Sequence, residues 1–156
     1  MAATLAQLNI STGGMPKLPV LFAYVGKSGV EGDKQRNLKY HGGPDRAVCL
    51  YSEELYAWLR NEHGVDLKAG SVGENFTTRG VDLDALEKGD LLRVGECLIQ
   101  LTDIRIPCSS LKKWDPNLKE TIKGHSGWVA RVIEEGMVRP GDAIEVVVKV
   151  ARAPRP

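Results

Sequence analysis

The chain has 156 residues, a length that suits one compact domain with a hydrophobic core of its own. Hydrophobic residues make up 42% of the chain and charged residues 26%, which is ordinary for a globular protein. The 21 basic and 20 acidic side chains nearly cancel, so the charge gives no reason to expect a nucleic acid or another polyanion as partner.

The cysteines indicate the cellular compartment in which the protein works. Cys49, Cys97 and Cys108 cannot all pair, and their spacing does not resemble a zinc site. An odd count without a basic, apolar leader indicates a reducing compartment. Apolar runs are far shorter than the ~20 residues that span a bilayer. We therefore expect a cytoplasmic protein that does not enter a membrane, with one domain over 1–150 and a flexible tail over 151–156.

In the first half of the chain, glycines and prolines separate short apolar segments, which favours many turns and short strands. Strands are predicted at 6–10, 20–25 and 47–51. Ser52 then suits a helix N-cap, because Glu53 and Glu54 follow in the first turn and complement the helix dipole. Gly64 suits the position where that helix ends.

The second half is again strand-like. Strands are predicted at 74–78, 91–94 and 97–106, and a last one begins at Ile144 and alternates apolar and polar residues. Within 97–106 the apolar residues change phase near Thr102 and Asp103, which predicts a β-bulge. Glycine–aspartate pairs such as Gly89–Asp90 are typical of turns between strands.

Cys108 is the residue with the clearest chemical signal. It follows the long strand and precedes Ser109–Trp114, which is predicted to form a short helix. Unpaired N–H groups at a helix start and the nearby cations Arg105, Lys112 and Lys113 would lower the pKa of a thiol and favour the thiolate. The alternative is a small buried cysteine that acts as a hydrophobic residue. Cys97 and Cys49 lie among strand residues and are interpreted as structural.

Polar clusters elsewhere supply candidate ligand groups. His41 and Arg46 flank Gly42–Gly43–Pro44–Asp45, where glycines allow a ligand to approach the backbone, and Lys34 adds a donor upstream. This segment lacks the frame of a phosphate-binding P-loop, and a solvated turn is the alternative.

A second cluster, Glu74, Asn75 and Arg79, could hydrogen-bond a heteroaromatic edge or an anion, or could simply cap a strand. His63 and His125 are interpreted as surface groups.

Together these segments resemble the MOSC family, which is named after the C-terminal domain of molybdenum cofactor sulfurase. The matching pieces occur in one order between about Lys17 and Val148: Gly32–Gln35, His41–Val48, Gly73–Phe76, Lys88–Asp90, Pro107–Cys108, Gly127–Trp128 and Gly141–Asp142. Each piece is short, but seven of them in order, with a cysteine among them, are fairly specific.

The resemblance implies a mostly β fold: a mainly antiparallel, closed β-barrel with a few short helices, like the pyruvate kinase β-barrel. It also implies binding of molybdenum cofactor, with Cys108 as metal ligand or persulfide carrier. His41, Arg46, Lys34 and Arg79 are then candidates for the anionic end of the cofactor, and Glu74 and Asn75 for the pterin edge. Relatives in this family reduce N-hydroxylated compounds.

Two functions remain open from the sequence. Cys108 would ligate molybdenum in an oxidoreductase fed by an electron-donor protein, or it would carry sulfur or cofactor in exchange with a desulfurase or a molybdoenzyme. A third interpretation is a β-rich interaction domain with an inert cysteine. The chain carries no recognisable Schiff-base lysine motif, so no pyridoxal phosphate is expected.

Overall fold

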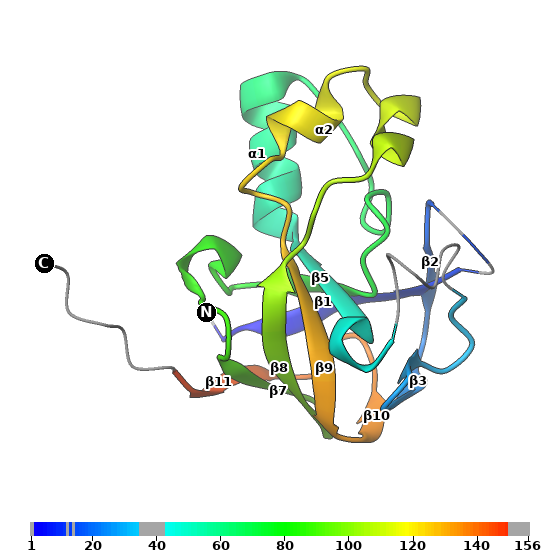
Figure 1. Ribbon diagram of the computed structural model, residues 1–156, viewed down its shortest axis with the longest axis vertical. Helices are drawn as coiled ribbons and strands as arrows, with labels where there is room; N and C mark the ends of the chain where they lie inside the picture. The colour runs from blue at the N-terminus through cyan, green and yellow to red at the C-terminus, as the bar shows by residue number, and fades with distance from the viewer. Residues whose placement is uncertain (1, 12, 14, 35–42, 150–156) are drawn as a thin grey trace, which may run out of the picture.

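The computed structural model describes residues 2–11, 13, 15–34 and 43–149. Short strands are the main regular element of the described chain, with one longer helix, as the frequent glycines predict (Figure 1). The strands are β1 Thr4–Ile10, β2 Leu18–Val20, β3 Ala23–Gly26, β4 Gly29–Val30, β5 Val48–Ser52, β6 Phe76–Arg79, β7 Leu91–Val94, β8 Cys97–Ile104, β9 Trp128–Glu134, β10 Gly136–Val138 and β11 Ile144–Val148. The helices are α1 Glu53–His63, α2 Leu118–Thr121, and the 3-10 turns η1 Pro44–Arg46, η2 Leu83–Ala85 and η3 Ser109–Lys113.

The strands form two sheets. One has the order β11-β7-β8-β9-β5-β6-β1-β2 and the other the order β10-β3-β4. Among the described strand pairs, β5 and β6 alone run parallel, so the mainly antiparallel prediction is confirmed.

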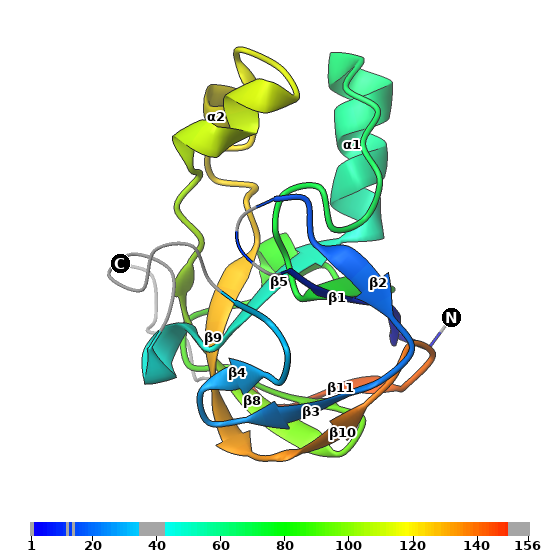
Figure 2. The same ribbon diagram turned by 90° about the vertical axis from the view of Figure 1, so that its right-hand side faces the viewer.

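The predicted closed barrel is wrong, because both sheets are open. Strands β11 and β2 are the edges of the larger sheet, and in the described chain no ladder joins them. The start of β1 meets the segment before β11 through one isolated bridge, Thr4 with Ala143. The chain also leaves the larger sheet after β2 and enters the smaller one at β3 (Figure 2). The single strand predicted over 20–25 is therefore interrupted at Leu21 and Phe22.

Helix α1 forms as its capping residues predict. The Ser52 side chain accepts a hydrogen bond from the Leu55 amide at 3.0 Å, and Gly64 ends the helix in the left-handed region at φ 66°. Tyr56 and Leu59 are its buried residues. No described helix has the length and apolar character that a bilayer crossing requires.

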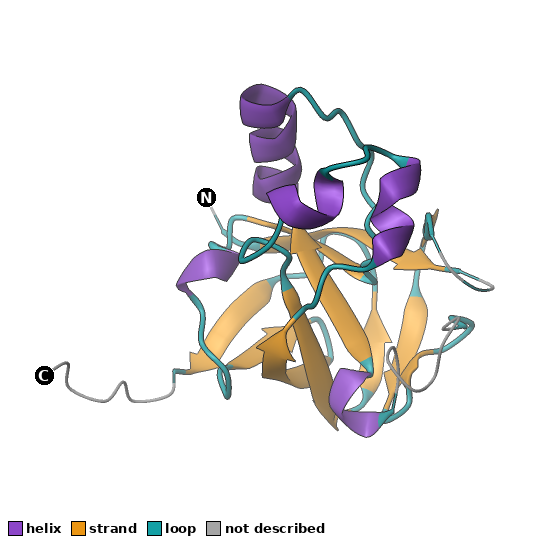
Figure 3. Ribbon diagram, turned by 45° about the horizontal axis from the view of Figure 1, so that its top comes forward, coloured by secondary structure: helices purple, strands orange, loops and turns teal. Residues whose placement is uncertain are grey.

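Two apolar clusters result from the alternation along the strands. Inside the larger sheet, residues such as Leu50, Phe76 and Ile99 form the main core. On the other face of β5, Tyr51 packs with Tyr56, Leu59, Leu111 and Leu118 beneath the helices. Helices α1 and α2 and the turn η3 thus lie at one end of the strands (Figure 3), and this second cluster holds them there.

Tyr51 carries a polar atom without a partner in this second cluster. Its hydroxyl is the buried side-chain oxygen that lacks a hydrogen bond among the described residues. Tyr51→Phe should therefore raise the free energy of unfolding by about 1 kcal/mol, since it removes a desolvated hydroxyl and keeps the edge contact with the Tyr56 ring. Chemical denaturation measures the change.

Tyr56→Phe is the matched control. The Tyr56 hydroxyl donates to Glu74 at 2.8 Å and accepts from the Val72 amide at 3.1 Å. Removing it should destabilise the protein by roughly 1–3 kcal/mol. Equal losses in both variants would mean that the Tyr51 hydroxyl does have a partner in solution.

Candidate functional site

Cys108 lies where the chain leaves β8 and enters η3. Its thiol is partly exposed, and Sγ lies 3.3 Å from the Ser110 hydroxyl. Burial acts to raise the pKa of this thiol. Hydrogen bonds from the Ser110 hydroxyl and amide, followed by the charge of Arg105, outweigh it and hold the pKa below its usual value. The short helix predicted after Cys108 is confirmed as η3.

Arg105 is held firmly beside this cysteine. Its guanidinium donates to the Val72 carbonyl, its amide donates to the Gly127 carbonyl at 3.0 Å, and its own carbonyl accepts from the Ser126 hydroxyl. A Cβ on Gly73 would lie 3.0 Å from the Arg105 guanidinium, and Gly73 has φ 88°, so only glycine fits there. The register shift between Leu101 and Asp103 confirms the predicted bulge just before this segment.

Removing the main donor to the thiol gives a direct test of this electrostatic arrangement. Ser110→Ala should raise the pKa of Cys108 and slow its alkylation near neutral pH roughly two- to fivefold, because a hydrogen bond to the thiolate is lost. The measurement is the pH dependence of iodoacetamide labelling in a Cys49→Ser background. Cys97 is silent there, since burial raises its pKa to about 12.

Ser109→Ala is the graded control, because the hydroxyl of Ser109 contributes least to lowering the pKa of Cys108. Its labelling profile should shift less than that of Ser110→Ala. Identical profiles in all three proteins would mean that these hydroxyl groups do not act on the thiol.

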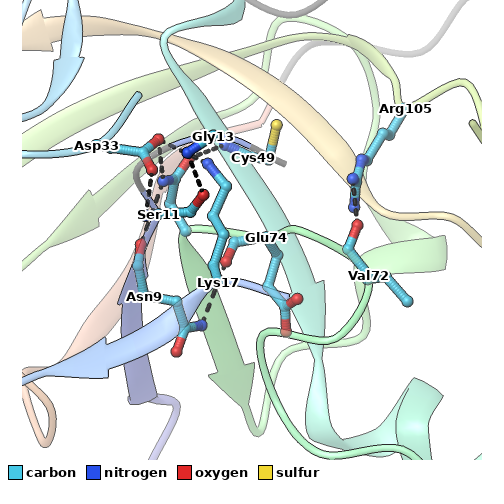
Figure 4. Close-up of polar contacts among 10 residues, drawn as sticks. Asn9, Ser11, Gly13, Lys17, Asp33, Cys49, Val72, Glu74 and Arg105 are labelled. Carbon is cyan, nitrogen blue, oxygen red and sulfur yellow. Dashed lines mark hydrogen bonds and ion pairs between the residues drawn. The ribbon is translucent and has the colours of Figure 1, made fainter. Parts of the chain in front are cut away.

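Cys49 and Tyr51 occupy the outer face of β5, while Val48 and Leu50 point into the main core. Cys49 is partly exposed. In the close-up, its sulfur points away from the hydrogen-bonded groups around Asp33 (Figure 4). A second thiol therefore lies on the same face of β5 as Tyr51, near the start of the strand.

A buried ion pair joins the segments around Cys49. Lys17 Nζ lies 2.6 Å from Asp33 Oδ2, and both side chains are more than nine-tenths buried. Asp33 also accepts from the Ser11 amide at 2.8 Å (Figure 4). It accepts from Asn75 Nδ2 at 2.9 Å as well, and Asn75 Oδ1 accepts from the Cys49 amide at 3.0 Å. One network thus fixes the chain before β2, after β4, in β5 and before β6.

Glu74 and Asn75, the predicted pterin-edge residues, are fully buried. The Glu74 carboxylate accepts from the hydroxyls of Tyr56 and Thr77 and from the Gly70 amide, at 2.8, 2.9 and 3.0 Å. Burial nevertheless raises its pKa. The polar atoms of both side chains thus have partners inside the protein. A role at the pterin edge stays a prediction on which the function proposed below does not depend.

The predicted cationic residues are placed differently from one another. Lys34 is exposed and lines a hollow of about 440 Å3 with Asp33 and Pro44, and Arg46 ends the nearby turn η1. Arg79 lies at the far end of β6 from Asn75, paired with Glu53 at 2.7 Å. His41 lies outside the described residues. The structure therefore brings Lys34 close to η1 and leaves Arg79 at the other end of β6.

Lys17 and Arg105 were not among the predicted site residues. Arg105 was noted only as a charge near Cys108 in sequence, and Lys17 had no signal except that it is the one charge in the run from Gly13 to Val25. Within the described ranges no three His, Cys, Asp or Glu side chains group as a metal site.

The family of the chain follows from comparison with known proteins. A model of the MOSC domain matches residues 37–145, and the chain belongs to this family. It is 34% identical over 143 residues to the uncharacterized protein YflK of Bacillus subtilis (strain 168), which covers 89% of this chain and 65% of that protein. Protein YiiM of Escherichia coli (strain K12) is 38% identical over 130 residues, which covers 79% of this chain and 58% of YiiM. The chain therefore spans less than two thirds of the length of these relatives.

A solved structure gives the same likeness in three dimensions. YiiM from Geobacillus stearothermophilus superposes with a TM-score of 0.78 at 29% identity, over 94% of this chain and 75% of that one. The suspected MOSC resemblance is thereby confirmed. The family's association with molybdenum cofactor is the background to the function proposed next.

Proposed function

We propose that this chain binds molybdenum cofactor through Cys108 and takes part in the reduction of N-hydroxylated compounds. The observation that carries this proposal is the partly exposed Cys108 thiol, whose pKa is lowered beside Arg105. A thiolate is a soft ligand and suits molybdenum, whereas an inert structural cysteine would be buried and protonated.

The residues around Cys108 fit a cofactor of this kind. The pterin carries a phosphate, and Arg105, with Lys34 and Arg46 further away, offers cationic groups for an anion. At Gly73 the missing side chain leaves room for the Arg105 guanidinium, which lies 3.0 Å from where a Cβ would stand. His41 stays a candidate for the anionic end. Arg79 is not assigned a role, because it is paired with Glu53.

The cofactor and the residues around Cys108 would have separate roles in the reaction. When bound, the cofactor supplies the metal redox chemistry that reduces an N–O bond. Cys108 would hold the metal through Sγ, and Ser110 and Arg105 lower the pKa of that thiol, which favours the thiolate. Electrons would come from a separate donor protein.

The second candidate is a carrier of sulfur or of cofactor, and the partial exposure of Cys108 favours it, because a partner protein can reach the thiol. The Cys108 thiolate would attack the outer sulfur of a desulfurase persulfide. The new S–S bond leaves a persulfide on Cys108, and the donor cysteine departs as a thiolate. A molybdoenzyme would then be the acceptor.

Reconstitution with molybdenum cofactor separates these functions. Stoichiometric molybdenum and turnover of an N-hydroxylated base with a chemical reductant would support the oxidoreductase. A transferable sulfur would support the carrier. It would be seen as an increase of about 32 Da on Cys108, the mass of one sulfur atom, that a thiol reagent removes. A protein that retains neither molybdenum nor sulfur would overturn both.

A further inference from the structure

The segment from Leu18 to Tyr24 exposes an apolar surface on the edge of the larger sheet. It contains no charged residue. Leu18 is 64% exposed, Leu21 84% and Phe22 63%, and they lie in β2 and in the connection to β3 (Figure 2). We call Leu18, Pro19, Leu21 and Phe22 the β2 surface. Its three large side chains expose about 400 Å2, within the range of the largest apolar patches on monomers, which are often functional.

The backbone at this edge disfavours the addition of another strand. Pro19 pairs with Asn9, whose own N–H and C=O are turned toward Asn75 and away from β2. The Asn9–Pro19 pair is therefore not hydrogen-bonded, and Pro19 faces outward without an N–H to donate. A partner must then pack against the side chains of this edge, because the backbone of β2 does not pair with a further strand.

The two lysines that flank the β2 surface along the chain both have partners within the protein. Lys17, the preceding residue, is buried against Asp33. Lys27 donates from Nζ to the carbonyls of Val132 and Ile133. Among the described residues, these two lysines are therefore not available to an anionic membrane, a nucleic acid or an acidic protein.

We propose that a second copy of this chain covers the β2 surface in a two-fold dimer, in which Leu21 and Phe22 of one copy pack against the same residues of the other. An uncharged apolar patch is complementary to itself, and a two-fold axis brings like surfaces together and closes the contact. The side chains of two copies would bury about 800 Å2, below the roughly 1,200 Å2 at which standard specific interfaces begin, so a weak dimer is expected.

Sedimentation velocity on the full chain, from low to high micromolar concentration, tests the dimer. Wild type should shift with concentration toward twice the 17.0 kDa of one chain. Leu21→Glu with Phe22→Glu should stay at the mass of one chain with an unchanged melting temperature, because both side chains are exposed.

Val147→Glu is the matched control. Val147 is 49% exposed on β11, the opposite edge of the same sheet, and this variant should dimerise like wild type. Three results would overturn the proposal: a monomeric wild type at the highest concentration, a dimer that persists in the Leu21 and Phe22 variant, or a dimer lost in Val147→Glu.

Discussion

Cys108→Ser is expected to abolish retention of molybdenum cofactor while it changes the free energy of unfolding by less than about 1 kcal/mol. The thiol is partly exposed and Ser110 is its hydrogen-bond partner, so little packing is lost. A serine hydroxyl does not ionise near neutral pH and is a poor ligand for a soft metal. Elemental analysis of the reconstituted protein, together with chemical denaturation, measures both effects.

Cys49→Ser is the control, because Cys49 is also a partly exposed thiol. It should retain molybdenum at the level of wild type. Retention in Cys108→Ser and loss in Cys49→Ser would move the ligand to Cys49, on the outer face of β5. A large loss of stability in Cys108→Ser would instead identify Cys108 as a core residue.

Local signals in the sequence predicted much of the secondary structure. The caps of α1, strand β7 and the bulge in β8 follow from side chains within a few residues of each feature, and these predictions are confirmed. Strand β9 was missed, because Trp128–Glu134 is apolar at consecutive positions and shows no clean alternation. The barrel was inferred from the family resemblance, and the turn pattern cannot show whether edge strands pair.

The site could be predicted where its chemistry is local. Cys108, Ser110 and Arg105 lie within six residues, so a strand followed by a short helix already indicates an activated thiol. The network around Asp33 could not be predicted, since Asp33, Lys17 and Asn75 come from three different segments of the chain. A sequence also does not show whether a polar residue faces a ligand or another buried group. Glu74 is the example, since its carboxylate is met by protein donors.

Asp33→Ala should destabilise the protein by about 3 kcal/mol or more, because it leaves the Lys17 ammonium buried without its counter-ion. The same change removes the acceptor for the Ser11 amide and for Asn75 Nδ2. Since Asn75 in turn binds the Cys49 amide, the loss would extend to the start of β5. Chemical denaturation of this variant measures the cost.

Lys17→Met in the same chain completes a double-mutant cycle. If the unpaired ammonium is the main cost, Asp33→Ala with Lys17→Met should recover a large part of the lost stability, because no buried charge remains. Arg79→Ala is the matched control. Its ion pair with Glu53 is almost half exposed on both sides, so its loss should cost less than about 1 kcal/mol. Equal costs for the two ion pairs would show that Lys17 and Asp33 are solvated in solution, and that the network does not hold the segments around Cys49 in place.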